Sequence, residues 1–401
     1  MLFTLSPAMI MMKLRFVLFL VLGLIFLGCT SVKKAQTQKD MFVYVGTYAK
    51  PDTEGIFGYR LNEETGELTQ VLRVKAGPNP SYLAITSDRK YLYAVNEVTE
   101  HEGQKSGAVS AFAIDPTTGN LTFLNRQPSL GGAPCYISLD EKNQMALVAN
   151  YVGGNVTALP LQEDGKLKSA TDMDQHVGKG PKPQQEAAHA HCILPAPGNQ
   201  FVVAVDLGID QIISYKLNAS AGGTLERQPQ PAFQAKAGAG PRHLTFHPNK
   251  RFAYVMNELD GTISALRFQQ DKGSFTEIET VSAIPKGYTG QVSGADIHVS
   301  PDGRFAYASN RGHNSIGVFK IEEESGKLTL VQHMSTHGDW PRNFTLTPSG
   351  KLMVVANQRS NNITTYHVNR QTGHLTYTGK SIELSSPVYL QVVKNFTPTS
   401  K

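Results

Sequence analysis

The chain has 401 residues, of which 18% are charged, 36 are glycine and 22 are proline, and its formal net charge is +5. Glycine and proline are spread along the chain rather than pooled in a linker, which favours one turn-rich, all-β domain. Lysine and arginine are also dispersed and form no basic run, so nucleic acid is not an expected partner.

Residues 1–29 differ from the rest of the chain and predict a signal peptide. Lys13 and Arg15 precede residues 16–27, which are apolar almost throughout. This stretch is short for a membrane-spanning helix and has the proportions of a signal-peptide core. The alternative is an uncleaved apolar anchor at the N-terminus.

Cys29 follows this apolar stretch and resembles the cysteine of a bacterial lipobox, which becomes the lipid-modified first residue of the mature protein. The small Gly28 fits that pattern, whereas Phe26 stands where leucine is usual. Residues 30–40 are polar and would tether the folded part, residues 41–396. We therefore expect a protein of the cell envelope, lipid-anchored to a membrane and facing the periplasm or the exterior. If the segment is not used, the protein would be cytoplasmic.

The other two cysteines, Cys135 and Cys192, fall in different repeats of the sequence described next. No CxxC spacing is present, so neither a disulfide framework nor a cysteine metal site is expected.

A strand–turn–strand unit recurs along the chain, and its clearest copy is residues 241–258. This copy contains a tight turn at residues 247–250 and a second strand that ends at Asn257. In each unit an apolar residue stands 11 positions after the start, and Asn or Asp stands 16 positions after the same start. Units of this kind start at residues 80, 134, 190, 241, 294 and 341.

Each unit continues into a third strand with alternating apolar residues and then into a fourth. The third strands are expected at residues 56–61, 107–114, 155–161, 211–217, 262–268, 315–321 and 362–368. Four short strands per repeat of about 50 residues are typical of a propeller blade.

The seventh unit is split between the two ends of the chain. Residues 387–393 read as a first strand without a second, and residues 41–47 read as a second strand without a first. Pairing them would close the ring and protect both edges. The sequence therefore predicts an all-β, seven-bladed β-propeller whose ring is closed by its N- and C-terminal strands.

In a propeller the start of strand one and the end of strand two lie at the same edge of each blade, so these positions converge on one mouth of the central channel. The strand-two ends are Asn96-Glu97, Asn150-Tyr151, Asp206, Asn257-Glu258, Asn310-Arg311 and Asn357-Gln358. The strand-one starts are His189-Ala190-His191, Arg242-His243, Asp296-Ile297-His298 and Arg342-Asn343.

The recurring Asn or Asp is interpreted as a turn cap that the fold reuses in every blade. Its neighbours differ between blades, because Glu97, Glu258 and Arg311 stand at equivalent positions. Charged side chains around a concave mouth predict a ligand pocket.

His189 and His191 share one face of an extended segment. They could form part of a zinc site, but no third ligand stands at a fixed spacing, so neither a metal nor a cofactor is expected. The chain has no GxSxG, Walker or dinucleotide-binding motif, which removes the common serine hydrolases, nucleotide-binding proteins and dehydrogenases.

At these positions the sequence resembles the lactonase family of propellers, which includes bacterial 6-phosphogluconolactonases and a fungal carboxy-cis,cis-muconate cyclase. The matching stretches are residues 44–48, 96–97, 189–191, 206–208, 240–243, 257–258, 296–298 and 309–311. They run from end to end of the predicted propeller.

The resemblance implies a lactonase that opens an anionic sugar lactone. We expect the protein to act as a monomer. The catalytic set of the cyclase branch falls on His189 or His191, Arg242, Glu258 and Arg311. Glu258 or a histidine would be the base, and Arg242 and Arg311 would hold the anion. The remaining expected substrate contacts are Glu97, His243, Asp296, His298 and Arg342.

Two alternatives remain open. A muconate-type cycloisomerase would use the same arginines with a general acid. A non-enzymatic envelope propeller that binds a partner protein would show an exposed apolar patch and would not depend on Glu258.

Overall fold

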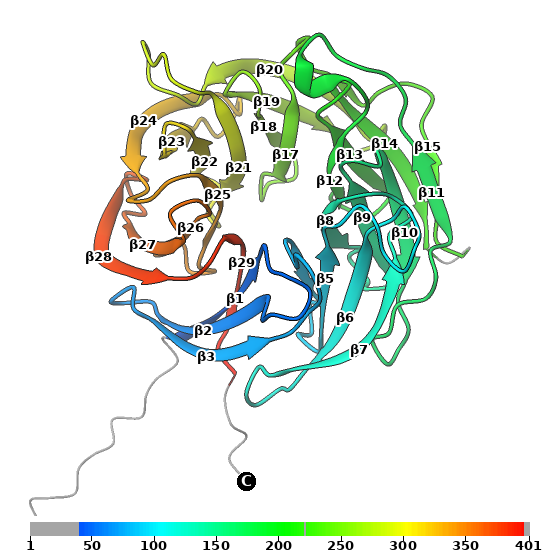
Figure 1. Ribbon diagram of the computed structural model, residues 1–401. Coiled ribbons are helices and arrows are strands. Elements are labelled where there is room, and N and C mark those ends of the chain that lie inside the picture. Colours follow the sequence, from blue (N-terminus) through cyan, green and yellow to red (C-terminus); the bar gives the residue numbers. More distant parts are fainter. Residues whose placement is uncertain (1–39, 220–221, 397–401) are drawn as a thin grey trace, which may run out of the picture. The chain divides into compact units, whose positions relative to one another are not determined.

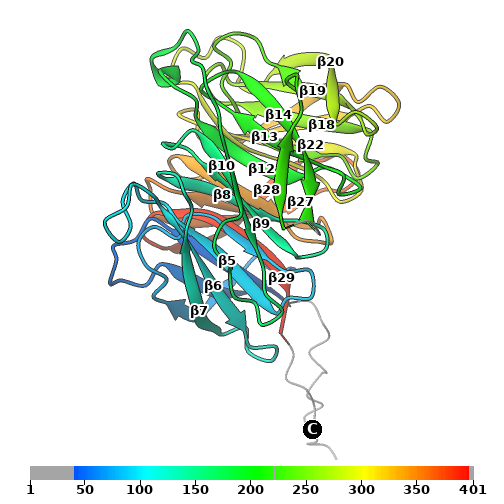
Figure 2. The same ribbon diagram turned by 90° about the vertical axis from the view of Figure 1, so that its right-hand side faces the viewer.

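The computed structural model describes residues 40–219 and 222–396, and these residues form seven antiparallel sheets around a central channel (Figure 1). Six sheets have four strands and the seventh has five. We name them blades A to G in ring order. Figure 2 shows the ring turned by 90°, with β7 of blade B and β20 of blade E at opposite ends. The prediction of an all-β, seven-bladed β-propeller is confirmed.

The strands of each blade are given from the channel outwards. Blade A comprises β29 (Pro387–Lys394), β1 (Asp40–Thr47), β2 (Ile56–Asn62) and β3 (Leu68–Val74). Blade B comprises β4 (Leu83–Ile85), β5 (Tyr91–Asn96), β6 (Ala108–Ile114) and β7 (Leu121–Pro128). Blade C comprises β8 (Pro134–Leu139), β9 (Met145–Asn150), β10 (Asn155–Pro160) and β11 (Asp172–Gln175). Blade D comprises β12 (Ala190–Pro195), β13 (Phe201–Asp206), β14 (Gln211–Asn218) and β15 (Thr224–Arg227), with β16 (Phe233–Gln234) also paired to β14.

Blade E comprises β17 (Pro241–Phe246), β18 (Phe252–Asn257), β19 (Thr262–Gln269) and β20 (Ser274–Ser282). Blade F comprises β21 (Ser293–Val299), β22 (Phe305–Arg311), β23 (Ser315–Ile321) and β24 (Leu328–Ser335). Blade G comprises β25 (Pro341–Leu346), β26 (Leu352–Asn357), β27 (Asn362–Val368) and β28 (Leu375–Glu383). One 3₁₀ helix, η1 (Pro183–Gln185), precedes blade D.

Blade A joins the two ends of the propeller. Its inner strand β29 pairs antiparallel with β1 from Met41 opposite Lys394 to Thr47 opposite Pro387. No other blade draws strands from both ends. The predicted closure of the ring is therefore confirmed, and it satisfies the backbone groups that both terminal strands would otherwise expose.

Buried tyrosines fasten neighbouring blades to one another. Their hydroxyls donate hydrogen bonds to glycine carbonyls in the turn before strand four of the next blade, in four pairs: Tyr44 to Gly119, Tyr93 to Gly165, Tyr254 to Gly326 and Tyr307 to Gly373, over 2.7–3.2 Å. Each tyrosine packs in the apolar layer between two sheets and satisfies its polar end in the next blade. These contacts limit rotation of one blade against another.

The recurring Asn at the end of strand two does more than cap a turn. The Nδ2 of Asn310 donates to Ala283 O over 2.8 Å, and the Nδ2 of Asn357 donates to Thr336 O over 3.2 Å. Both carbonyls lie in the segment that arrives from the preceding blade. Because the amides are fully buried, the Asn fixes that incoming segment at the mouth of the channel.

Blade D carries Asp206 where blades B, C, E, F and G carry Asn. His176 Nδ1 lies 2.6 Å from Asp206 Oδ2, and the other ring nitrogen lies 2.7 Å from the Tyr215 hydroxyl. A side chain of the incoming segment therefore replaces the backbone carbonyl as the partner in this blade.

The predicted signal peptide at residues 1–29, its Cys29 and residues 30–39 of the polar tether lie outside the described residues. Within the described ranges, no helix is long and apolar enough to cross a membrane.

The Asn contact predicts a stability effect. Asn310→Ala should lower the free energy of unfolding by about 1–3 kcal/mol, because Ala283 O would lose its fully buried amide donor and keep only His333 Nε2, which lies 3.0 Å away. Thermal and denaturant unfolding measure the change. Asn120→Ala removes an exposed turn amide and serves as the control. Equal unfolding free energies for the two variants would contradict the role given to Asn310.

Candidate active site

The inner strands share an irregularity at the channel mouth: a β-bulge interrupts their pairing with strand two. The register shifts between Pro134 and Tyr136 in blade C, Ala190 and Cys192 in blade D, Pro241 and His243 in blade E, Gly294 and Ile297 in blade F, and Pro341 and Asn343 in blade G. The residues inside these bulges are Cys135, His191, Arg242, Ala295 with Asp296, and Arg342. A bulge re-aims the side chain it carries, which explains why these residues gather at one end of the ring.

In blades A, C, E and G the residue just before the inner strand has a left-handed backbone, and in blade B the same conformation occurs at Asn79, four residues before β4. These residues are Asn79 (φ 45°), Ala133 (φ 52°), Gly240 (φ 66°), Trp340 (φ 67°) and Ser386 (φ 45°), and each precedes a proline. For a residue other than glycine this conformation costs about 1–2 kcal/mol. The ring thus accepts local strain to bring the chain sharply into the channel at the bulge.

The second half of the mouth is formed by the residue after strand two, or in blade F by Arg311, the last residue of β22. These residues are Tyr48, Glu97, Tyr151, Leu207, Glu258, Arg311 and Gln358. All except Leu207 are polar or charged, although the fold needs none of them for its pairing. The site is therefore built from two rings of positions, the bulges and these strand ends.

Glu258 lies at the centre of the strongest ion pairs of the mouth. Its Oε2 lies 3.0 Å from Arg242 Nε and 2.7 Å from Arg311 Nη2. Both guanidiniums are also anchored on backbone, because Arg242 Nη1 donates to Ala295 O and Arg311 Nη2 to Gly294 O, each over 2.7 Å. Oε1 makes no hydrogen bond or ion pair within the described residues.

The charges of this cluster set its protonation. Burial by itself would raise the pKa of Glu258, but the guanidiniums of Arg311 and Arg242 outweigh it and hold that pKa below its usual value. Burial and the charge of Arg242 lower the pKa of Arg311 to about 10, against the opposing effect of Glu258. All three groups are therefore ionised at neutral pH.

His191 adds a neutral imidazole to the mouth. Its Nδ1 is buried without a hydrogen-bond partner in the described part of the chain. Its ring meets Tyr151 edge-on at 5.5 Å and His243 at 5.2 Å. Burial, followed by the charge of Arg242, holds the pKa of His191 well below its usual value. The imidazole is thus uncharged and free to exchange a hydrogen bond with a ligand.

His189 lies beside this group with its polar atoms occupied. Its ring stacks on Tyr151 at 4.5 Å, and its Nδ1 lies 2.9 Å from Tyr151 O. Asp206 Oδ1 accepts a hydrogen bond from the His189 backbone N–H. Gly208 permits this packing, because a Cβ there would lie 1.9 Å from Ala187 O. The geometry therefore favours His191 over His189 as the histidine that meets a ligand.

Asp296 ties blades E, F and G together around the channel. Its Oδ1 lies 2.8 Å from His243 Nδ1, and its Oδ2 lies 2.9 Å from His298 Nε2 and accepts from Asn343 Nδ2 over 2.5 Å. His243 Nε2 lies 3.2 Å from Arg242 Nη1, so this histidine also orients the arginine. Asp296, His243 and His298 thus form a supporting network next to the Glu258 cluster.

The two histidines of this network differ in their protonation. Burial and the charge of Arg242 lower the pKa of His243 to about 4, so this ring is neutral. Burial alone would lower the pKa of His298, but the Asp296 carboxylate outweighs it and raises that pKa. Burial would likewise raise the pKa of Asp296, yet His298 and His243 hold it well below its usual value. Asp296 and His298 therefore form an ion pair below the raised pKa of His298.

Arg342 and Glu97 lie on the side of the mouth formed by blades G and B. Glu97 accepts hydrogen bonds from the Tyr48 hydroxyl over 2.9 Å and from Ser81 Oγ over 2.5 Å. The Arg342 guanidinium lies over the Tyr48 ring at 5.3 Å. The sequence patterns identified Glu97 and Arg342 but missed Tyr48, which follows β1, and Ser81, which lies two residues before β4.

Three tyrosines lie across the channel. The Tyr82 ring lies 4.2 Å from the Tyr136 ring and 3.9 Å from the Tyr389 ring, and the edge of His243 meets Tyr136 at 5.4 Å. A hollow of about 740 Å³ lies against these rings and is lined by the turns after β4 and β8, at the end of the channel away from Glu258. Tyr82 and Tyr136 therefore border the hollow and also contact His243 of the Asp296 network.

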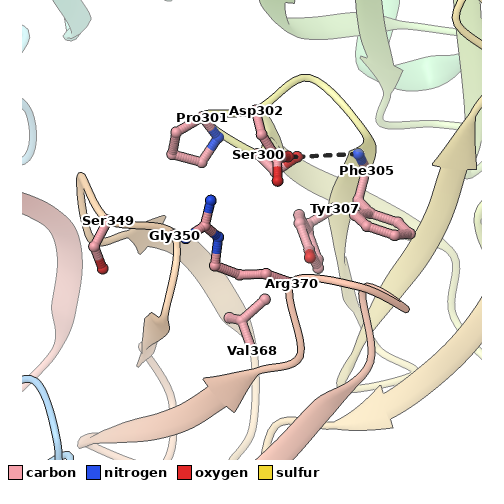
Figure 3. Close-up of a pocket in the computed structure, with 9 residues that line it drawn as sticks. All are labelled: Ser300, Pro301, Asp302, Phe305, Tyr307, Ser349, Gly350, Val368 and Arg370. Atoms are coloured by element: carbon pink, nitrogen blue, oxygen red, sulfur yellow. Dashed lines mark hydrogen bonds between the residues drawn. The ribbon is translucent and has the colours of Figure 1, made fainter.

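A smaller cavity of about 240 Å³ lies between the turns of blades F and G (Figure 3). Arg370 and Tyr307 line it together with Ser300, whose hydroxyl oxygen accepts from Phe305 N and donates to Asp302. It lies at the face opposite the charged mouth and contains none of the predicted site residues.

Within residues 40–219 and 222–396, no three His, Cys, Asp or Glu side chains are placed to hold a metal ion. The mouth offers the carboxylates of Glu97 and Glu258, neutral imidazoles and three guanidiniums. These groups can activate water and stabilise an oxyanion, which are the requirements of ester hydrolysis.

Comparisons with known proteins agree with this chemistry. The family model for the lactonase seven-bladed β-propeller matches residues 42–392. A 6-phosphogluconolactonase of Bacillus subtilis is 44% identical over 76% of this chain and 85% of its own. Among solved structures, a proposed 6-phosphogluconolactonase of Bacteroides fragilis has 37% identity and a TM-score of 0.82, covering 90% of this chain and 99% of its own. A periplasmic gluconolactonase of Pseudomonas aeruginosa has 32% identity and a TM-score of 0.83, covering 88% and 99%.

The Asp296 network predicts a titration effect. Asp296→Asn should lower the pKa of His298 to 6.5 or below, because the carboxylate that raises it would be absent while burial remains. Proton NMR of the histidine rings measures this shift. The control Asp302→Asn, in a turn of the same blade, should leave the His298 titration unchanged. An unaltered His298 pKa in Asp296→Asn would contradict the pairing.

The same variant predicts a pH-dependent loss of stability. A raised histidine pKa stabilises the fold fully below the unfolded pKa, and this contribution is lost as pH rises through the folded pKa. The Asp296 carboxyl has a lowered pKa in the folded state, so it stabilises the fold at pH values above its unfolded pKa. Asp296→Asn should therefore cost about 3 kcal/mol near pH 6 and less at pH 9, as measured by denaturant unfolding at both values.

Proposed function

The chain belongs to the lactonase family of seven-bladed β-propellers, and from this membership we propose that it hydrolyses the ester of an anionic sugar lactone, as a 6-phosphogluconolactonase does. The observation that carries the proposal is the Glu258 carboxylate. Two arginines hold one of its oxygens and leave the other without a partner. The side chain is 21% exposed, so water can reach it at the mouth.

Glu258 acts as the general base in this scheme. Arg242 and Arg311 fix the orientation of the carboxylate through Oε2, and Oε1 takes a proton from the attacking water. The arginines also reduce its basicity, because they hold its pKa below the usual value. This loss of basicity is offset because the carboxylate is already ionised and already oriented when the substrate binds.

The developing oxyanion is stabilised by donors that need no rearrangement. Water forms a bond to the carbonyl carbon, the ring C–O bond breaks, and the leaving alkoxide receives a proton to give the hydroxy acid. Arg311 and Arg242 lie beside the base and provide positive charge where the carbonyl oxygen becomes negative. His191 is neutral and can hydrogen-bond the reacting group.

The alternatives from the sequence receive less support. A partner-binding propeller calls for one exposed apolar patch. Among the described residues, four exposed large apolar side chains, Val71, Phe123, Met173 and Leu330, belong to different strands of blades A, B, C and F, and three more, Leu130, Val152 and Val177, lie in the separate loops after β7, β9 and β11. A cycloisomerase would use the same arginines, but the relatives reported above are named as lactonases. Hydrolysis is therefore the reading we adopt.

We also propose that the protein is exported and lipid-anchored through Cys29. Support comes from the lipobox-like sequence and from the periplasmic gluconolactonase of Pseudomonas aeruginosa. Strand β1 runs from Asp40 to Thr47, and Thr47 lies at the charged mouth, so the chain joins the ring at the opposite face. An anchored propeller would thus leave its mouth accessible to substrate.

The proposed hydrolysis predicts loss of activity on changing the base. Purified wild-type protein should open 6-phosphogluconolactone well above the spontaneous rate, and Glu258→Gln should reduce kcat by ~10²–10⁴-fold. Because the pKa of Glu258 is held below its usual value, wild-type kcat/KM for neutral gluconolactone, which carries no titrating phosphate, should stay level from pH 5 to 7 and fall only at lower pH. Glu279→Gln, an outer-strand control, should keep full activity. Glu258→Gln turning over at the wild-type rate would overturn the assignment.

The proposed anchor predicts a lipid label. Full-length protein produced in a bacterial host fed labelled palmitate should carry the label, and Cys29→Ser should not. Equal labelling of the two, or none in either, would refute lipidation at Cys29.

A further inference from the structure

Arg342 differs from the other arginines of the mouth in having no anionic partner. Its side chain is half-buried, yet its guanidinium makes no hydrogen bond or ion pair within the described residues. Arg242 and Arg311 are both neutralised by Glu258. A guanidinium has five N–H donors. The Nε atoms of Arg242 and Arg311 are fully buried, whereas the donors of Arg342 keep contact with solvent at the mouth and can reach a ligand.

The surroundings hold Arg342 in place without neutralising it. Its planar group lies over the Tyr48 ring at 5.3 Å, a geometry that orients the cation. The Tyr48 hydroxyl donates to Glu97, and Ser81 donates to the same carboxylate. Glu97 is thus occupied by two hydroxyls rather than by the arginine. The donors of Arg342 are preorganised and vacant.

A second unpaired polar atom lies in the same blade. Gln358 Oε1, immediately after β26, is buried and has no donor among the described residues. The Gln358 backbone N–H donates to Trp340 O, two residues before Arg342. An anion receptor and a hydroxyl acceptor therefore come from one blade. A sugar derivative with an acidic end group offers an anion for Arg342 and hydroxyl donors for Gln358 Oε1.

The charges of the mouth are consistent with an anionic ligand. Among the described residues, the guanidiniums of Arg242, Arg311 and Arg342 interact with the carboxylates of Glu258, Glu97 and Asp296, and the charge of Asp296 is already paired with His298. Burial alone would lower the pKa of Arg342, but Tyr48 and Glu97 outweigh it and raise that pKa, so the group stays charged. One positive charge therefore remains unbalanced until a ligand binds.

We propose that Arg342 is the anion-binding residue of the mouth, and that it makes the site select lactones whose far end carries a phosphate or carboxylate over neutral lactones. This inference rests on the proposed lactone hydrolysis and assigns its substrate preference to one side chain. Arg342 binds the acidic end over blade G, while Glu258 and its two arginines act on the ester over blades E and F. The distinction separates binding of the substrate's charge from the chemical step.

The test compares three lactones in wild type and Arg342→Gln. The substrates are neutral gluconolactone, carboxylate-bearing glucaro-1,4-lactone and 6-phosphogluconolactone. The variant should lose ~10- to 100-fold in kcat/KM, mainly through KM, for the acidic lactones that wild type prefers, and less than about threefold for the neutral one. Whichever acidic lactone loses more identifies the anion that the residue recognises.

Two further variants control for folding and net charge. Arg342→Lys keeps the positive charge but loses the paired N–H donors and the stacking on Tyr48. It should therefore retain part of the preference for acidic lactones that Arg342→Gln loses. Arg267 also lies over an aromatic ring, Phe252, at 5.0 Å, but on the exposed outer side of blade E. Arg267→Gln should leave all three rates unchanged. An equal loss for neutral and acidic lactones in Arg342→Gln would overturn the proposal while leaving lactone hydrolysis intact.

A binding measurement separates this inference from the proposed function. Calorimetry should show that 6-phosphogluconate binds wild type at least ~10-fold more tightly than it binds Arg342→Gln. Gluconate, which lacks the phosphate, should bind the two proteins with equal affinity and bind wild type more weakly than 6-phosphogluconate does. If no lactone is turned over but this difference persists, the proposed hydrolysis fails and the anion site stands. If both proteins bind 6-phosphogluconate equally, the anion site fails.

Discussion

The ion pairs between Glu258, Arg242 and Arg311 are the interaction on which the candidate site depends. The three side chains come from blades E and F, and two of them are almost fully buried. Charges removed from water stabilise one another only when their geometry is held accurately. The ring meets this requirement with the buried tyrosine contacts between blades, the Asn contacts to incoming segments and the Asp296 network behind Arg242. The rigidity of the propeller is therefore part of the proposed chemistry.

The β-bulges explain how a repetitive fold acquires an asymmetric site. Every blade needs a strand one and a strand two, and the pairing between them fixes most side chains. The bulged residue escapes this pairing, so it can be Cys135 in blade C, His191 in blade D or Arg342 in blade G without disturbing the sheet. The residue after strand two has the same freedom. Chemistry varies at these two positions while the fold is conserved by its repeat.

The repeat made the fold readable from the sequence, because apolar periodicity and the recurring Asn do not depend on the site. The third strand expected at residues 315–321 matches β23, and the split blade matches the β29–β1 pairing. The positions of Glu258 and Arg311 followed from the same pattern. The role of Arg342 did not, because its lack of a partner depends on which oxygens Glu97 and Glu258 offer to other donors. Tyr48 was missed for the same reason, because its part in the site consists of its hydrogen bond to Glu97 of blade B and its contact with Arg342 of blade G.

A structure of the protein crystallised with 6-phosphogluconate tests the central claim most directly, because it locates the ligand without assuming turnover. We expect the acid at the charged mouth, with its phosphate within hydrogen-bonding distance of Arg342 and its carboxylate next to Glu258, Arg311 and His191. Binding in the hollow beneath Tyr82, Tyr136 and Tyr389, or at the mouth with the phosphate turned away from Arg342, would contradict the account.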